Sequence, residues 1–344
     1  MVVKRKKKTK SAPRPRKGRG RRLAWALFLA LVFALASTVW FLLNRAPAEI
    51  AVPLGIAQSV GVHGTVAGAF DSPRGVAMAP DGSLVVGDLG NSRIEVFSSD
   101  GTFKTAFGTR APAGGVGKPG EFNEPSDVAV GPDSTVYVAD AWDERIQKFD
   151  LKGKPLGEFG GARYSFFSPR CITVDRAGNI YVADTGNSTV KVIDPAGRLI
   201  KTLGGVGGGE GGLSREVFGV AVNSHGEIFV ADHGNRRIHK YSALPSGAWI
   251  KDRKVPGWAA SDPFWPHLAV DRQDLIYAGD SGNGKIWVYD GDLNYRATLE
   301  GPQGQSPIAA IIGLAFSPAG DLWVADMGAN KLLRLAPFNL PVPK

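Results

Sequence analysis

Six close copies of one short stretch run through this chain, and they constrain its fold more than any other feature. The clearest copy covers Ile180 to Ile193, with the sequence IYVADTGNSTVKVI. An alternating apolar run ends in Val-Ala-Asp, a Gly-Asn turn follows, and a second alternating run leaves the turn, which predicts a β-hairpin. The other five copies begin at Leu84, Val136, Ile228, Ile276 and Leu322.

Two further apolar runs flank each hairpin, so every repeat predicts four short antiparallel strands. The Asp that ends the second strand recurs six times between positions 88 and 326, at a mean spacing of about 48 residues, which falls in the range of propeller blades. A four-stranded unit with apolar residues on both faces must stack on like neighbours, and radial stacking gives a propeller. We therefore predict an all-β, six-bladed β-propeller of four-stranded antiparallel blades.

The two ends of the array predict how the ring closes. After Leu332 to Leu335 the sixth repeat has a Pro-rich remainder, FNLPVPK, which is a poor fourth strand. Ala51 to Val60 reads as a strand that has no preceding blade. We expect this N-terminal strand to complete the sixth blade.

The repeat also carries a family resemblance, in the pattern P-x-G-V-A-V, a turn with Gly, and Y-V-A-D-x-G-N-x-R-I-x-x-F. From about Ile50 to Phe338 the chain resembles the NHL repeat family, whose members fold as six-bladed β-propellers. The match is strong in repeats 1 and 4, and it departs from the pattern in repeats 2, 3 and 6. The departures are at Asp143-Glu144, Thr189 and Ala329.

The N-terminus predicts a membrane anchor. Residues 23–43, LAWALFLALVFALASTVWFLL, carry no charge, and as a helix they would rise roughly 31 Å, the thickness of the hydrocarbon core. Residues 1–22 hold twelve Lys or Arg and no acid, which places them on the cytoplasmic side. A cleaved signal peptide is the alternative, since Ala-x-Ala patterns occur at Ala34 and Ala46.

This organisation predicts a single-pass membrane protein with an extracytoplasmic, cell-surface propeller. The predicted parts are a basic cytoplasmic tail (1–22), a transmembrane signal-anchor helix (23–43), a linker (44–49), the propeller (50–338) and a C-terminal tail (339–344).

The formal charge of +9 does not indicate a nucleic-acid partner. The twelve cations of residues 1–22 leave 29 basic and 32 acidic residues in the rest of the chain, a net charge of −3. A slightly acidic domain outside the cytoplasm makes nucleic acid an unlikely partner. The sequence gives no indication of the oligomeric state.

The six repeated Asp residues are interpreted as structural. A catalytic pair needs carboxylates that converge from different elements, whereas these occupy one equivalent position in each blade. Asp side chains readily accept hydrogen bonds from turn amides, and we expect that role for Asp88, Asp140, Asp184, Asp232, Asp280 and Asp326. The Asn residues three positions later are expected to occupy the turn itself, because Asn tolerates positive φ.

Neither a metal nor a cofactor is predicted. One enzyme class that resembles this family, the peptidylglycine α-hydroxyglycine amidating lyases, binds zinc through a His in several Pro-His blade starts. Here only Pro266-His267 has that form, and one ligand does not make a zinc site. The corresponding positions elsewhere are Gly75, Asp127, Cys171, Gly219 and Gly313. Cys171 reads as a small apolar filler, and His267 would bind metal only if the chain were an enzyme.

The loops that connect the blades are the more informative candidates for binding. They carry Tyr164, Phe166 and Phe167 between blades 2 and 3, and Trp258, Phe264 and Trp265 between blades 4 and 5. Exposed together, such aromatic residues would form a binding patch; the alternative is that they cover the core beneath the loops. Other candidates on this face are Trp142 and His233, which follow repeated Asp residues, with Arg74, Arg170 and Arg110 as polar contacts.

We therefore predict a membrane-anchored, extracytoplasmic propeller that acts as a scaffold and binds a protein, peptide or glycan on its loop face. The alternative function is a propeller enzyme, a metal-dependent lyase or a lactonase-like hydrolase, with its site at the mouth of the central channel. The sequence leaves the catalytic question open, with the balance toward a non-enzymatic protein.

Overall fold

The structure, a computed structural model, describes residues 50–258, 265–301 and 306–340. The predicted cytoplasmic tail, membrane helix and linker lie outside these residues, as do Phe264 and the last four residues of the C-terminal tail. Within the described ranges, no helix is both long and apolar enough to cross a membrane.

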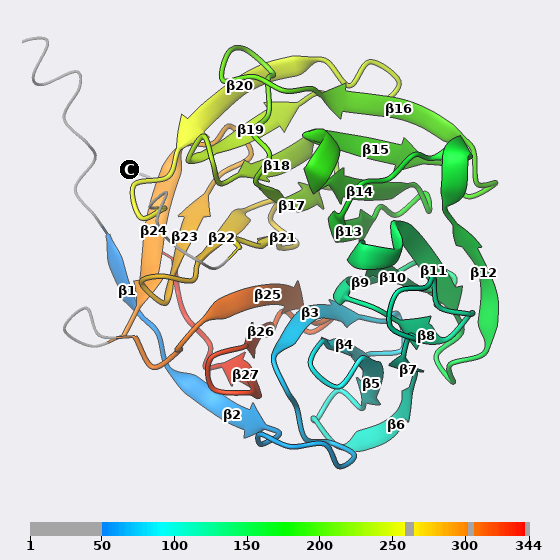
Figure 1. Cartoon of the computed structure of the whole chain (residues 1–344). Coiled ribbons are helices and arrows are strands. Elements are labelled where there is room, and N and C mark those ends of the chain that lie inside the picture. Colours follow the sequence, from blue (N-terminus) through cyan, green and yellow to red (C-terminus); the bar gives the residue numbers. More distant parts are fainter. Residues whose placement is uncertain (1–49, 259–264, 302–305, 341–344) are drawn as a thin grey trace, which may run out of the picture. The chain divides into compact units, whose positions relative to one another are not determined.

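Six β-sheets are arranged in a ring around a common centre (Figure 1). Each contains four consecutive antiparallel strands, except that the sixth takes its outer strand from the N-terminus and the fifth gains an extra one. This confirms the predicted all-β six-bladed propeller. The first three blades are β3 (Pro73–Met78), β4 (Leu84–Asp88), β5 (Arg93–Phe97) and β6 (Phe103–Phe107); β9 (Pro125–Val130), β10 (Val136–Asp140), β11 (Arg145–Phe149) and β12 (Pro155–Phe159); and β13 (Pro169–Val174), β14 (Ile180–Asp184), β15 (Thr189–Ile193) and β16 (Leu199–Gly204).

The second half of the ring repeats this order. Its blades are β17 (Val217–Val222), β18 (Ile228–Asp232), β19 (Arg237–Tyr241) and β20 (Trp249–Lys254); β21 (Leu268–Val270), β22 (Ile276–Asp280), β23 (Lys285–Tyr289) and β24 (Tyr295–Glu300); and β25 (Ile311–Phe316), β26 (Leu322–Asp326) and β27 (Lys331–Leu335). Short 3₁₀ turns occur at Ala141–Asp143, Gly161–Arg163 and Thr185–Asn187, and β7 (Thr109–Arg110) pairs in parallel with β8 (Glu121–Phe122). The first strand of each blade is the innermost, and these six strands contact one another around the centre (Figure 1).

The ring is closed by the N-terminal segment, which forms two strands rather than one. β2 (Ile56–Val60) pairs antiparallel with β27 and is the outer strand of the sixth blade. β1 (Ala51–Pro53) instead pairs in parallel with β24, and so belongs to the fifth blade. The segment therefore joins the last two blades as well as completing one of them.

The hydrophobic core lies between the blades. Each of the six buried clusters combines side chains from two neighbouring sheets, and the sixth pairs blade 6 with blade 1. In that cluster Trp323 and Leu332 pack with Phe70, Val86 and Phe97. A blade separated from its neighbours would expose two apolar faces, which is why the repeats fold as a closed ring.

The repeated Asp residues hold the turns and the connections together. Asp88 is fully buried; its Oδ1 accepts from the backbone N–H of Asp71 at 2.7 Å, and its Oδ2 accepts from the side chain of Asn91 at 2.7 Å. The other five copies are equally buried and accept hydrogen bonds from the turn, the incoming connection or the neighbouring strand. They lie in separate blades, as expected for structural residues.

The strained residue of each hairpin turn is not the Asn expected from the sequence. The left-handed conformation falls one position later, at φ values between 52° and 60°, on Ser92, Glu144, Ser188, Arg236, Gly284 and Asn330. The preceding Asn bonds to the repeated Asp, as in Asn187 and Asn235. The Asn therefore provides the side-chain hydrogen bond to the repeated Asp, and the residue that follows the Asn adopts the left-handed conformation.

Glu95, on β5, predicts a pH dependence of stability. It is fully buried, and its Oε1 accepts from Gly68 N–H at 3.1 Å and lies 2.9 Å from Arg93 Nη2. Burial raises the pKa of Glu95 from 4.5 to about 7, and Arg93 opposes this rise. Because the folded state holds this proton more tightly, stability is greatest below the unfolded pKa and declines as the pH rises through the folded pKa.

We therefore expect Glu95→Gln to remove up to about 3 kcal/mol of the decline in unfolding free energy between pH 4.5 and 7. Urea unfolding of both proteins at several pH values across that window measures the difference. Parallel curves for the two proteins would show that folding does not raise the pKa of Glu95.

Candidate functional site

Six equivalent positions at the start of the inner strands surround the axis of the ring. Three of them, Gly75, Gly219 and Gly313, are glycines, and a Cβ on Gly75 or Gly313 would collide with an atom of the adjoining inner strand. The other three positions carry side chains with chemistry: Asp127 on β9, Cys171 on β13, and His267 immediately before β21. Glycine therefore lets the strands approach closely, while three blades direct polar groups to one place.

Asp127, Cys171 and His267, here called the axial cluster, converge from blades 2, 3 and 5. One donor atom of each lies within 4.8 Å of the donor atoms of the other two. His267 Nε2 is 3.4 Å from Asp127 Oδ2, and the same oxygen accepts from Ile172 N–H at 2.9 Å. Asp127 and Cys171 are 2% and 1% exposed, and the His267 side chain is 12% exposed. This grouping is a candidate catalytic or metal-binding site.

The thiol of the axial cluster is protonated in this environment. Burial raises the pKa of Cys171 well above its ordinary value, and the hydrogen-bonded carboxylate of Asp127 raises it further. A protonated thiol is a poor nucleophile, since the thiolate is the reactive form. Without a cation nearby, Cys171 is therefore a hydrogen-bond donor to Asp127 rather than an attacking group.

A second group, the arginine–tryptophan cluster, lies next to the axial cluster along the same strands. It consists of Arg74, Arg170, Glu124 and Trp265, from blades 1, 3, 2 and 5 respectively. The two guanidinium groups both pair with Glu124 Oε1, at 2.9 and 2.8 Å. Both also stack on the indole of Trp265, with Cζ atoms 3.9 and 4.4 Å from the ring centroid. Four blades thus contribute to one contact.

The two guanidinium groups of the arginine–tryptophan cluster outnumber its single carboxylate. Burial lowers the pKa of Arg74 to about 10, Glu124 opposes the shift, and the adjacent cation Arg170 adds to it. Within the described residues, Arg74 Nε and Glu124 Oε2 are buried without a hydrogen-bond partner. Two cations therefore share one carboxylate oxygen, an arrangement that favours a further anion.

An aromatic row extends outward from Trp265. Phe218 stacks on Trp265 at 5.0 Å with an interplanar angle of 23°, and His233 lies 6.2 Å from Phe218 and 6.3 Å from Trp258. The structure thus brings together three residues singled out from the sequence, Trp258, His233 and Trp265, through a residue that was missed. Phe218 occupies the same strand position as Arg74 and Arg170, and that equivalence could have identified it.

Four of the aromatic residues predicted for the loop face do not form a common exposed patch. Tyr164 and Phe166 are buried and stack on each other at 5.7 Å inside the core between blades 2 and 3. His233 and Trp258 are 2% exposed, so they support the loop rather than present a surface. The alternative interpretation, that these rings cover the core, therefore holds for Tyr164, Phe166 and Trp258, which belong to the core between blades, and His233 is also buried.

The other predicted positions have separate surroundings. Trp142 and Phe167 are exposed, at 69% and 56%, on the connections of blades 2 and 3. Arg110 donates to the backbone carbonyl of Gly90 at 2.7 Å and does not reach the arginine–tryptophan cluster in the contacts of the described residues. Phe264 lies outside the described part of the chain.

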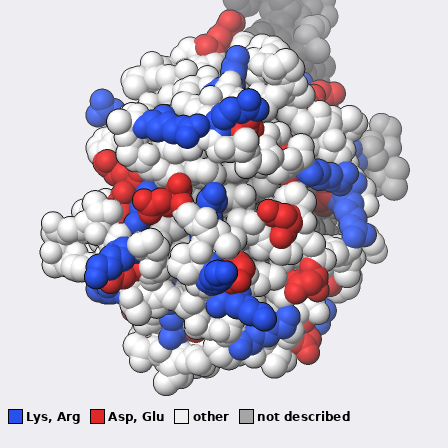
Figure 2. All heavy atoms as spheres, turned by 90° about the vertical axis from the view of Figure 1, so that its right-hand side faces the viewer, with Lys and Arg blue, Asp and Glu red and all other residues white. Residues whose placement is uncertain are grey.

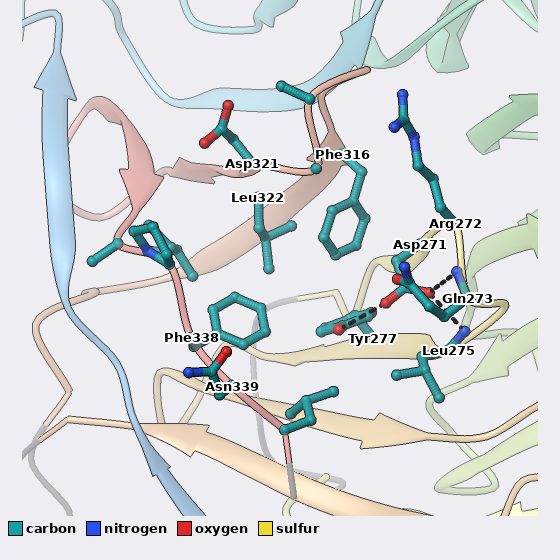
Figure 3. A pocket seen from close by; sticks show the side chains of 16 residues that line it. Asp271, Arg272, Gln273, Leu275, Tyr277, Phe316, Asp321, Leu322, Phe338 and Asn339 are labelled. Atoms are coloured by element: carbon teal, nitrogen blue, oxygen red, sulfur yellow. Dashed lines mark hydrogen bonds between the residues drawn. The ribbon is translucent and has the colours of Figure 1, made fainter. Parts of the chain in front are cut away.

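A cavity of about 500 Å³ lies away from the axial cluster, between blades 5 and 6 (Figure 3). Its most prominent polar group is Asp271, which accepts from Gln273 N–H, Leu275 N–H and the Tyr277 hydroxyl at 2.8 to 3.0 Å. Blade 3 contains the same arrangement around Asp175 and Tyr181. The hydrogen bonds of Asp271 are therefore a structural feature of the repeat, and they do not indicate a function for this cavity.

The outer edge of the ring carries charges of both signs. On the side shown in Figure 2, Lys and Arg side chains are interspersed with Asp and Glu, and neither sign forms a continuous field. Extended nucleic-acid sites typically have a basic stripe, and this side of the molecule lacks one.

Comparison with known proteins agrees with this architecture. A family model described as NHL repeat matches residues 70–97, 122–149, 166–193 and 219–241, which lie in blades 1 to 4. Protein SUPPRESSOR OF QUENCHING 1, chloroplastic, from Arabidopsis thaliana is 30% identical over 153 residues, covering 37% of this chain but only 14% of that protein. NHL repeat-containing protein 3 from Homo sapiens is 25% identical over 236 residues, covering 64% of this chain and 67% of that protein.

Among solved structures, a gluconolactonase from Xanthomonas campestris superposes with a TM-score of 0.57 at 16% identity, over 86% of this chain and 99% of that one. At this identity the likeness concerns the fold alone. The repeat matches, the six blades and the relatives agree with the pattern quoted from the sequence: the chain contains NHL repeats and folds as a six-bladed β-propeller.

Proposed function

We propose that this protein is a membrane-anchored, extracytoplasmic scaffold that binds an acidic segment of a protein or peptide on its loop face. The arginine–tryptophan cluster is the observation that carries the proposal. Residues 23–43 would provide the anchor, and the propeller would present the cluster outside the cytoplasm. The uncharged 21-residue run and the twelve preceding cations support this topology.

The chemistry of the arginine–tryptophan cluster selects an anionic partner. Arg74 and Arg170 reach the same oxygen of Glu124, so a ligand carboxylate could take over one guanidinium while Glu124 keeps the other. Guanidinium groups bind carboxylates in a forked geometry that discriminates in favour of flat anions. An Asp or Glu side chain, or a chain terminus, meets that requirement.

Trp265 supplies the apolar part of the same contact. Its ring is partly exposed and lies against the two guanidinium groups, with Phe218 stacked on it. Trp and Arg are the residue types that most often dominate binding energy at interfaces, especially near the centre of a contact. The centre of the loop face is therefore the expected point of attachment.

The test uses spheroplasts that display the full-length chain, incubated with labelled peptides rich in Asp and Glu or rich in Lys and Arg. We expect the acidic peptides to bind, and both Trp265→Ala and the double variant Arg74→Gln/Arg170→Gln to weaken binding by about 2 kcal/mol, roughly 30-fold. Leu156→Ala, at an exposed position on the outer strand β12, is the matched control.

The outcomes separate the parts of the proposal. Binding that requires permeabilised cells would contradict the extracytoplasmic location but not the ligand. Binding of acidic glycans in place of peptides would reassign the class of ligand. Equal binding by all variants would show that the arginine–tryptophan cluster is not the site.

A second candidate function is a propeller enzyme, either a lyase or a lactonase-like hydrolase. The axial cluster favours it, because a carboxylate, a thiol and an imidazole at one point of a propeller axis can serve proton transfer or metal chemistry. Turnover of a lactone by the full-length chain that is lost on His267→Ala would favour this function over the scaffold.

A further inference from the structure

The axial cluster has a geometry close to that of a metal site. Zinc binds nitrogen and sulfur ligands at about 2.0 to 2.3 Å, so tetrahedral ligand atoms lie roughly 3.3 to 3.8 Å apart. The donor atoms of Asp127, Cys171 and His267 already lie within 4.8 Å of one another. Side-chain movements of about 1 Å would bring them to bonding distance of one ion.

The axial cluster also lacks a permanent positive charge. Asp127 is buried, and in the described part of the chain its ion pairing is with His267 alone, at 3.4 Å. The nearby cations Arg74 and Arg170 are paired with Glu124 instead. A buried carboxylate is costly unless it is paired or coordinates a metal, so the site would gain from a cation.

His267 provides a second, independent sign. Its Nε2 lies 3.4 Å from Asp127 Oδ2, so the ring nitrogen and the carboxylate oxygen face the same space, while Nδ1 is buried without a hydrogen-bond partner among the described residues. With the proton on Nδ1, Nε2 directs its lone pair to the space beside Asp127 Oδ2, where one metal ion would contact both atoms.

The scaffold itself does not require these side chains. Gly75, Gly219 and Gly313 occupy the same level of the other three blades and have no side chain there. The repeat therefore folds without an acid, a thiol or an imidazole at this position. Their convergence in blades 2, 3 and 5 needs a reason beyond the fold.

We propose that Asp127, Cys171 and His267 bind one zinc-class transition-metal ion on the propeller axis. A thiolate and an imidazole select zinc or cobalt over calcium or magnesium, which prefer six or more oxygen ligands. Three protein ligands leave a fourth position for water, as in zinc sites that remain open. The metal site would lie next to the arginine–tryptophan cluster and would share no residue with it.

To test this, the full-length chain is first treated with a chelator. One sample is then titrated with zinc and a second sample with cobalt. We expect one zinc per chain and, with cobalt, a sulfur-to-metal charge-transfer band. Cys171 is the single cysteine of the sequence, so no other residue can produce that band. Cys171→Ser should abolish it, and Asp127→Asn and His267→Gln should weaken zinc binding at least about 100-fold.

His225→Gln is the control, since His225 is exposed and paired with Asp274, and it should bind zinc as the unmodified chain does. A second measurement needs no variant: zinc should protect Cys171 from alkylation in partly denaturing buffer. Substoichiometric zinc, no cobalt band and no protection would overturn the proposal.

This inference does not depend on the proposed ligand. Trp265→Ala is expected to lose the acidic peptide and to keep the metal, whereas His267→Gln should do the reverse. Loss of both properties in both variants would instead show that the two clusters form a single site, and would overturn the separate metal site proposed above.

Discussion

Replacing Ile56–Val60 with Gly-Pro-Gly-Pro-Gly in the full-length chain is expected to lower the unfolding free energy by at least about 4 kcal/mol. β2 pairs with β27 at four positions, from Ile56 opposite Leu335 to Val60 opposite Leu332. A backbone hydrogen bond contributes about 1 kcal/mol net, and the loss of Val60 also uncovers the cluster that joins blade 6 to blade 1. Alternating prolines cannot restore the pairing.

The same replacement should also make the protein associate. An unpaired β27 presents a free strand edge, and such edges pair with other chains. Thermal unfolding with size-exclusion chromatography measures both effects. The control places the same five residues at positions 112–116, in a loop between β7 and β8. If both replacements have equal stability and elute at the same size, closure by β2 is not what holds the ring.

Asp140→Ala is expected to destabilise the protein by about 3 to 5 kcal/mol, because it leaves a buried cation with one partner fewer. Asp140 is fully buried and accepts from the N–H groups of Asn123 and Glu124 at 2.9 and 3.0 Å. It also accepts from Arg145 Nε at 3.2 Å and Gln147 Nε2 at 3.1 Å. Four donors lose their acceptor in one change.

Asp133→Ala is the matched comparison for Asp140→Ala. Asp133 lies in an exposed turn of the same blade and accepts from Thr135 N–H and Oγ1, so its removal should cost less than about 1 kcal/mol. Urea unfolding of the two variants gives the difference. Similar losses in both would mean that the repeated Asp is no more than an ordinary turn residue.

The fold could be predicted because its information is local and repeated. Alternation with period two determines which residues face the neighbouring blade, and a hairpin turn follows each Asp. Six registered copies then leave stacking in a ring as the way to bury both faces. The division of the N-terminal segment between β1 and β2 could not be predicted, because it depends on which strand edges two different blades leave open.

The burial of the loop aromatics could not be predicted from the local sequence either, because it also depends on contacts between distant parts of the chain. Tyr164 is buried because its hydroxyl donates to the carbonyl of Gly197 and its ring stacks on Phe166. The hydrogen bond has no sequence signature, since Gly197 lies 33 residues away from Tyr164. A Trp or Tyr in a connection looks the same in sequence whether it faces solvent or covers the core.

The axial cluster was overlooked for a different reason, which concerns residue type. Only one of the six aligned positions is a histidine, which argues against a zinc site of the Pro-His kind, while two of the others carry a carboxylate and a thiol. The positions themselves were aligned correctly by the repeat. Comparing all non-glycine residues at Gly75-equivalent positions would have found Asp127, Cys171 and His267 together.

The parallel strand β1 has a mechanical consequence. Ile50 accepts from Thr298 N–H at 2.9 Å, and Leu54 donates to Glu300 O at 2.7 Å, on either side of the paired residues 51–53. Tension applied along the chain at Ile50 must therefore detach β1 from β24 before it reaches β2. β1 therefore protects β2, the strand that closes the ring, from the pulling force. Loss of β1 alone would leave the six blades joined.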